Sequence, residues 1–207
     1  MRPTSCRLFT GRIEMICGPM FAGKSTELIR RLKRHTRAGK RVLVLKHAID
    51  DRFHKSSIVN HDGGEAEALA VSTLRGIDLT GVDVVGIDEG QFFGGEELAD
   101  FCRGAAGSGV VVIAAGLSGD FQQRAFPSMS ALFPLVDEVS HICAVCDTCG
   151  SDAHFSCRVV AGGESQSQIL VGGAESYRAS CRACLPGGRR CTALGSSQPA
   201  ERCRENK

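Results

Sequence analysis

The sequence has no tryptophan and one tyrosine, and aromatic residues make up only 5% of its 207 residues. It also lacks a strong charge of either sign, since 25 basic residues face 23 acidic ones for a net charge of +2. Non-specific nucleic-acid binding needs basic surface and stacking aromatics, so no nucleic-acid partner is expected. The longest apolar run, at 110–115, falls far short of the roughly 20 residues that cross a bilayer. No membrane partner is expected either.

Composition places the chain among ordinary globular proteins, with 43% hydrophobic and 23% charged residues. A mass of 22.0 kDa allows one domain and a small appendage. The first twelve residues contain three arginines but little apolar content, which makes a poor targeting segment. Eleven cysteines are many for this length, and their odd number favours metal-bound thiolates over a secreted disulfide scaffold. We therefore expect a cytoplasmic protein.

Short apolar runs alternate with amphipathic stretches, a pattern typical of βαβ units and a mostly parallel sheet. The expected fold class is α/β, with strands at 13–17, 42–45, 82–87 and 110–115, a helix at 25–37 and a loop at 50–66. After about residue 140 the apolar runs shorten and cysteines accumulate. A piece of about forty residues rarely folds without a staple. The expected domains are therefore 1–140, 141–186 and a disordered tail over 187–207.

The segment 18–25 matches the phosphate-loop pattern G-x-x-x-x-G-K-S/T. It follows an expected strand and opens an expected helix, so backbone amides and the helix N-terminus would face a polyphosphate. In such loops the lysine reaches the β- and γ-phosphates and the hydroxyl binds Mg²⁺. The alternative is a glycine-rich turn with a solvated lysine. The residues are Gly18, Pro19, Met20, Phe21, Ala22, Gly23, Lys24 and Ser25.

A second apolar strand ends in two carboxylates, Asp88 and Glu89. Ligands of parallel α/β sheets bind at the carboxyl ends of strands, so both acids should lie beside the phosphate loop. Neighbouring strand residues point to opposite faces, which allows Asp88 to organise Mg²⁺ and Glu89 to act as the general base. A solvated turn or a helix cap is the alternative reading.

Two C-x-x-C pairs, Cys146/Cys149 and Cys181/Cys184, are separated by a long segment. Four thiolates in this spacing suit a closed, tetrahedral and therefore structural Zn²⁺ site. Spacing alone leaves the register open, because Cys143 could replace either cysteine of the first pair. Buried unpaired thiols or an adventitious disulfide are the other readings.

Four blocks occur in a fixed order: GPMFAGKSTELIRR from residue 18, IDEGQFF at 87–93, the first C-x-x-C, and VGGAESYRASCRAC at 171–184. In these blocks the chain resembles thymidine kinases of the small, cellular, zinc-containing type, over about residues 11–184. The resemblance implies a P-loop (RecA-like) parallel sheet flanked by helices, with a small zinc-bound lasso domain over the nucleoside. It also implies phosphoryl transfer from ATP to the 5′-hydroxyl of thymidine or deoxyuridine, in deoxynucleotide salvage for DNA synthesis.

The resemblance also assigns residues. It implies Glu89 as the general base and selects Cys146, Cys149, Cys181 and Cys184, rather than Cys143, as the zinc ligands. The implied nucleotide and Mg²⁺ site adds Thr26, Asp88 and Gln91 to the phosphate loop. The implied nucleoside site consists of Met20, Asp50, Arg52, Phe92, Phe121, Leu170, Val171, Gly172, Gly173 and Tyr177.

Family members are usually homotetramers inhibited by thymidine triphosphate, and both properties are expected by resemblance. A zinc-ribbon NTPase that binds nucleic acid is the alternative, supported by the arginines of the tail and opposed by the scarcity of aromatics. A catalytically silent homologue is a third reading, which the intact Lys24 and Glu89 oppose. Ser118 stands where the family usually has an acid, and the function of that acid is expected to be absent or taken over by Asp120.

Overall fold

The structure, a computed structural model, describes residues 11–49, 57–59, 65–159 and 176–186. Its centre is a six-stranded sheet in the order β5-β2-β6-β7-β1-β8, in which every pairing is parallel. The expected parallel α/β sheet is thereby confirmed. The strands are β1 (Arg12–Gly18), β2 (Val42–His47), β5 (Leu69–Val71), β6 (Val84–Asp88), β7 (Val111–Leu117) and β8 (Glu138–His141).

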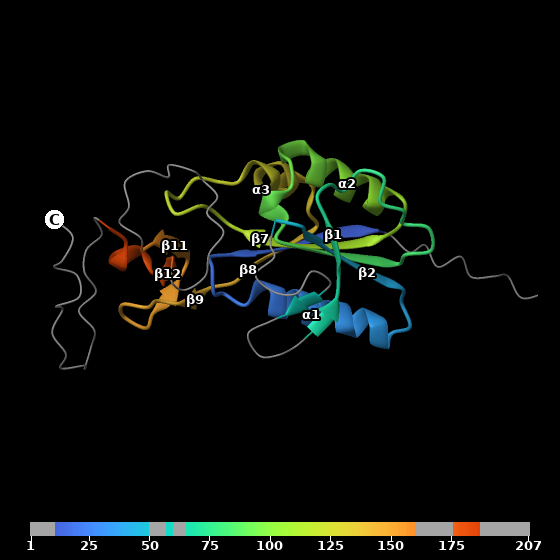
Figure 1. The fold of residues 1–207 in the computed structure, drawn as a ribbon. Helices are drawn as coiled ribbons and strands as arrows, with labels where there is room; N and C mark the ends of the chain where they lie inside the picture. The colour runs from blue at the N-terminus through green and yellow to red at the C-terminus, as the bar shows by residue number, and fades with distance from the viewer. Residues whose placement is uncertain (1–10, 50–56, 60–64, 160–175, 187–207) are drawn as a thin grey trace, which may run out of the picture.

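Helices cover both faces of the sheet (Figure 1). On one face lies α1 (Lys24–Arg37), whose apolar side chains pack on one alternate set of strand residues. On the other face lie α2 (Gly95–Gly107) and α3 (Pro127–Leu132), which pack on the opposite set. This arrangement explains the nearly continuous apolar runs of β6 and β7, because strands covered on both faces have no solvent side.

One arginine fastens α1 to two strands. Arg31 contacts Glu14 of β1 at 2.8 Å and Glu27 of its own helix at 2.8 Å. It also lies 3.3 Å from Glu138 and donates to the hydroxyl of Ser140 at 2.7 Å, both on β8. Only 5% of Glu14 is exposed. Buried carboxylates are kept when they are paired, and here the pairing joins the helix to the sheet.

The predicted loop at 50–66 is wrong in part. The described residues there include a short antiparallel hairpin formed by β3 (Ser57–Val59) and β4 (Glu65–Glu67). Three-residue strands are too short for a period-two pattern to stand out in a polar segment. The predicted strands and first helix are confirmed, with ends that differ by one or two residues from the sequence-based bounds.

A small lobe follows β8, at the left of Figure 1. It contains two antiparallel pairs, β9 (Ala144–Val145) with β10 (Asp152–Ala153), and β11 (Phe155–Arg158) with β12 (Tyr177–Ser180). Among its described residues the buried cluster consists of alanines and cysteines, which is little apolar surface to stabilise a fold. The predicted tail over 187–207 lies outside the described residues.

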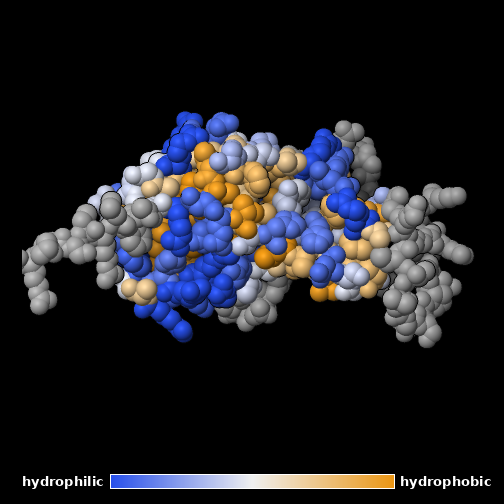
Figure 2. Space-filling model, turned by 180° about the vertical axis from the view of Figure 1, so that it is seen from behind, coloured by the Kyte–Doolittle hydropathy of each residue, from blue (hydrophilic) through white to orange (hydrophobic). Residues whose placement is uncertain are grey.

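The surface combines polar and apolar areas. Seen from behind, polar residues dominate the lower left of the body, while apolar residues gather above them and again towards the right (Figure 2). Of the helices in the described part of the chain, none has the length and apolar content needed to span a membrane. The remaining helical elements are single 3-10 turns, η1 (Gly90–Phe92), η2 (Phe133–Leu135) and η3 (Arg182–Cys184).

Candidate active site and metal centre

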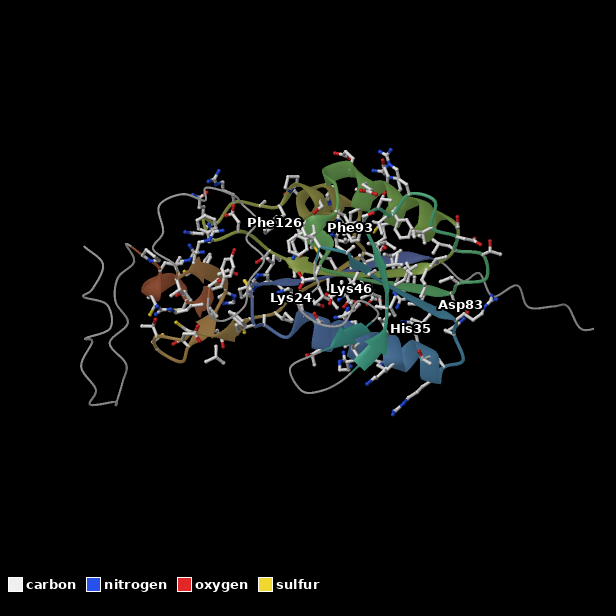
Figure 3. All side chains as sticks on the ribbon, in the orientation of Figure 1. Lys24, His35, Lys46, Asp83, Phe93 and Phe126 are labelled. Carbon is white, nitrogen blue, oxygen red and sulfur yellow. The ribbon has the colours of Figure 1, made fainter. Side chains whose placement is uncertain are left out.

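The phosphate loop and the Asp88–Glu89 pair meet at the carboxyl end of the sheet, on the side of the small lobe. β7 lies between β1, which leads into the phosphate loop, and β6, which carries Asp88. Figure 3 shows Lys24 at this end, while Phe93 and Phe126 lie on the face that carries α2 and α3. Parallel strands whose order reverses at such an edge leave a crevice for a ligand.

The phosphate loop joins β1 to α1 through backbone conformations that few residues adopt. Gly23, which precedes the helix, has φ 78°, and Phe21 has φ 66° although it is not glycine. Gly18 is required for another reason, because a Cβ there would lie 2.3 Å from the carbonyl oxygen of Ile142. The Lys24 ammonium donates to the carbonyl oxygen of Pro19 at 2.7 Å, so it closes the loop on itself.

Asp88 ends β6 with 5% of its surface exposed. Its Oδ1 accepts from the amide of Glu89 at 3.0 Å, and the carboxylate is hydrogen-bonded to the Ser25 side chain. Burial, followed by the charge of Glu89, raises the pKa of Asp88 from 3.8 to about 7, against the lowering effect of Ser25 and Lys24. A carboxylate and a hydroxyl held together are oxygen donors of the kind Mg²⁺ binds.

Glu89 adopts a left-handed backbone conformation, with φ 54°, and its charge lies close enough to Asp88 to help raise the pKa of that carboxyl. The Glu89 Oε2 accepts a hydrogen bond from the side-chain amide nitrogen, Nε2, of Gln91. The side-chain oxygen of Gln91, Oε1, in turn accepts from the backbone N–H of Leu117 at 3.0 Å. Only 3% of Gln91 is exposed. Gln91, predicted to contact the cofactor, therefore lies beneath Glu89 and fixes it to the end of β7.

In the described part of the predicted nucleoside site, Arg158 contacts two of the predicted aromatic residues. The Arg158 guanidinium lies 4.0 Å from the ring centre of Phe121, and it donates to the Tyr177 hydroxyl at 3.3 Å. Phe92 lies in η1, next to the Glu89 turn, with the ring of His47 6.1 Å away. Of the predicted residues, Asp50, Arg52, Leu170, Val171, Gly172 and Gly173 lie outside the described residues.

Sequence reasoning missed two basic residues at this edge. Lys46 is 3% exposed and is the register partner of Asp88, so in parallel strands both side chains emerge on the same face. A lone lysine inside an apolar strand was the available signal. Arg158 lies two residues after Ser156 on β11, so the two side chains share one face of that strand. This shared face could be predicted only after residues 155–158 were known to form a strand. Asp120, which follows Ser118 by two residues, caps a turn: its Oδ1 accepts from the backbone amides of Gln122 and Arg124, both at 2.8 Å.

The four predicted metal ligands converge in the small lobe. The sulfur atoms of Cys146, Cys149, Cys181 and Cys184 all lie within 4.8 Å of one another, and those of Cys149 and Cys181 are 3.7 Å apart. Tetrahedral zinc with bonds of about 2.3 Å places its sulfurs about 3.8 Å apart. The residues present therefore fit zinc. Cys143 is exposed and outside this cluster, which settles the register that spacing alone left open.

Local hydrogen bonds prepare the thiols for a cation. The bonds from Ser151 lower the pKa of Cys149 to about 6. Burial opposes ionisation of Cys181, but hydrogen bonds from Cys184 outweigh it and lower the pKa of that thiol. Thiolates are the form that binds metal. The first pair turns tightly, with the amide of Gly150 donating to the carbonyl of Cys146 at 2.9 Å.

Comparison with known proteins identifies the family. The sequence model of the family described as "Thymidine kinase" matches residues 11–185. The chain belongs to the thymidine kinase family. Curated thymidine kinases of Bacteroides thetaiotaomicron and Bacteroides fragilis are 44% identical to it over 176 residues, which cover 84% of this chain and 86% of each relative.

Membership of the thymidine kinase family confirms the resemblance predicted from the four ordered blocks, and it makes the chain a phosphotransferase. The matched span includes both the phosphate loop and the four-cysteine lobe. A zinc-ribbon NTPase that binds nucleic acid is not favoured.

Proposed function

We propose that this chain is an ATP-dependent thymidine kinase that phosphorylates the 5′-hydroxyl of thymidine and of deoxyuridine, in salvage of deoxynucleotides for DNA synthesis. The observation that carries this proposal is the pairing of a phosphate loop with a carboxylate fixed across the crevice. Glu89 is held by Gln91, and Gln91 is held by the end of β7. A positioned base facing bound phosphates is what phosphoryl transfer to an alcohol requires.

In the proposed reaction, the 5′-oxygen forms a bond to the γ-phosphorus of ATP while the bond from that phosphorus to the β–γ bridging oxygen breaks. The 5′-hydroxyl proton passes to the Glu89 carboxylate, and ADP leaves with the bridging oxygen. The loop amides, Lys24 and Thr26 would bind the phosphates and neutralise their charge. A positioned base contributes roughly 10²–10⁴-fold to such a rate.

We assign Mg²⁺ to Ser25 and Asp88, because their oxygens are hydrogen-bonded at the foot of the loop. When bound, the ion would neutralise charge on the β- and γ-phosphates. Zinc would be held by Cys146, Cys149, Cys181 and Cys184 in a structural role, since four thiolates leave no coordination position for water.

For the nucleoside, we assign Met20, Phe92, Phe121 and Tyr177 as the walls around the base, with residues 141–186 as a lobe closing over it. The contacts of Arg158 with Phe121 and Tyr177 support this assignment because they join the loop after β7 to the lobe. We assign Asp50, Arg52 and residues 170–173 to the same site by family membership. A cytoplasmic homotetramer inhibited by thymidine triphosphate completes the proposal.

The test is a panel of nucleosides assayed with radiolabelled ATP, Mg²⁺ and zinc-replete protein. Thymidine and deoxyuridine should yield monophosphates, and no product from thymidine would overturn the proposal. Glu89→Gln should lower kcat by about 10²–10⁴-fold with little change in ATP affinity. Glu96→Gln, on the exposed start of α2, is the matched control and should keep full turnover.

A further inference from the structure

One residue of the phosphate loop, Phe21, has a strained backbone conformation that neighbouring contacts must stabilise. Phe21 has φ 66°, a region that costs energy for any side chain other than glycine and persists only where surrounding contacts enforce it. Its side chain is 39% exposed, so packing of its own ring is a weak candidate for that enforcement. The contacts of its two neighbours are therefore decisive.

The residue before Phe21 is bound to the small lobe. The backbone N–H of Met20 donates to the Oγ of Ser156 at 3.0 Å, across a separation of 136 residues. Ser156 lies on β11 and is only 4% exposed, so water competes poorly for its hydroxyl. This bond also directs one loop amide toward the lobe.

The residue after Phe21 packs on the same lobe. Ala22 lies against the buried cluster that includes Cys146, Cys181 and Ala179. Ala179 is the register partner of Ser156, and β12 runs directly from it into Cys181. The β11–β12 strand pair therefore connects a metal-ligand cysteine to both contacts that flank Phe21.

We infer that Ser156 is a positioning residue for the phosphate loop, and that through it the four-cysteine lobe braces the loop in its phosphate-binding shape. The Ser156 hydroxyl and the Ala22 contact fix the loop on either side of Phe21, so the loop's amides are ordered before nucleotide arrives. A loop that is ordered before binding loses less conformational entropy when nucleotide binds, so the affinity is higher. The inference rests on the proposed function in one respect, namely that this loop binds nucleotide phosphates.

Three variants test this role. Ser156→Ala removes the hydroxyl, and Ser156→Thr keeps it. Ser128→Ala is the matched control, because Ser128 is 1% exposed and its hydroxyl has no hydrogen-bond partner within the described part of the chain. Two measurements are made without nucleoside: hydrogen exchange of the peptide 18–25 in the unliganded protein, and the Kd for ADP with Mg²⁺ by calorimetry. Zinc content of each protein is measured by elemental analysis.

Ser156→Ala should accelerate exchange in 18–25 and raise the Kd for ADP, each by about fivefold, the effect of one neutral hydrogen bond. Zinc content should be unchanged, Ser156→Thr should restore wild-type values, and Ser128→Ala should leave both measurements unchanged. Unchanged exchange in Ser156→Ala, or changed exchange with an unchanged Kd, would overturn the inference. Wild-type protein that binds ADP but does not phosphorylate thymidine would refute the proposed function and leave this inference standing.

Discussion

Replacing Asp88 with asparagine should stabilise the magnesium-free protein, and more so at pH 8 than at pH 5. Asp88 is 5% exposed, and burial together with the charge of Glu89 raises its pKa to about 7. The folded state therefore resists its ionisation, whereas the unfolded chain ionises it near pH 3.8. The asparagine side chain would still offer a carbonyl oxygen to the Glu89 amide, which now donates to Asp88 at 3.0 Å.

The magnitude follows from linkage between protonation and folding. A rise in pKa from 3.8 to about 7 corresponds to about 4 kcal/mol of lost stability once the pH exceeds 7. Because the folded state raises the pKa of this acid, the contribution of Asp88 to stability falls as the pH rises from about 4 to 7 and falls no further above that. At pH 5 the penalty is smaller, about 1–2 kcal/mol. The advantage of Asp88→Asn should therefore grow by about 3 kcal/mol between pH 5 and pH 8.

The assay is thermal unfolding of zinc-loaded protein in magnesium-free buffer at both pH values. For a chain of this length 1 kcal/mol corresponds to about 2–4 °C in Tm, so the gain at pH 8 should reach several degrees. The same variant should lose most phosphoryl-transfer activity if Asp88 holds Mg²⁺. A Tm gain of equal size at both pH values, or no gain at pH 8, would refute the electrostatic reasoning.

Three further changes have defined outcomes. Arg31→Ala should lower the free energy of unfolding by about 2–4 kcal/mol in urea titrations, because the buried Glu14 carboxylate on β1 loses an ion-pair partner. The control Arg30→Ala, at an exposed ion pair, should cost under about 1 kcal/mol. Equal losses for the two variants would contradict the importance of the buried pair. Burial lowers the pKa of His47, so the contribution of this residue to stability should fall as the pH drops below 6.5. In urea titrations His47→Gln should therefore lose less stability than wild type on acidification below that pH, and an unaltered profile would exclude this contribution. Cys181→Ser should lose zinc by elemental analysis while Cys143→Ser keeps it, and zinc retained by the first variant would disprove the ligand assignment.

The parallel sheet was predictable because its strands are covered on both faces, so runs such as 110–115 are apolar at every position. The phosphate loop and the Asp88–Glu89 pair were predictable because each is a local pattern at the end of such a strand. The β3–β4 hairpin was not, because three-residue strands in polar sequence have no period to detect. Strand order was also beyond reach, since it depends on packing between segments far apart in the chain.

Within the site, contacts between distant segments were the features that the sequence concealed. The resemblance assigned Gln91 to the nucleotide site, but no local pattern showed that its side chain also contacts Glu89 and Leu117. Spacing allowed Cys143 to replace either cysteine of the first pair; the resemblance selected Cys146 and Cys149, and their sulfur atoms lie with those of the second pair. Arg158 depends on a hairpin that joins residues on either side of a long segment, so no local pattern identifies its partners.

The position of β7 between β1 and β6 sets the width of the crevice. Neighbouring strands lie about 4.8 Å apart, so two spacings separate the phosphate-loop strand from the Asp88 strand by about 10 Å, a gap that accommodates a hydrated cation and a chain of phosphates. Gly116 near the end of β7 keeps this spacer thin, since a Cβ there would lie 2.6 Å from the Met129 sulfur. A side chain at that position would force β7 and α3 apart, and the spacing between the β1 and β6 ends would change although no predicted site residue had been altered.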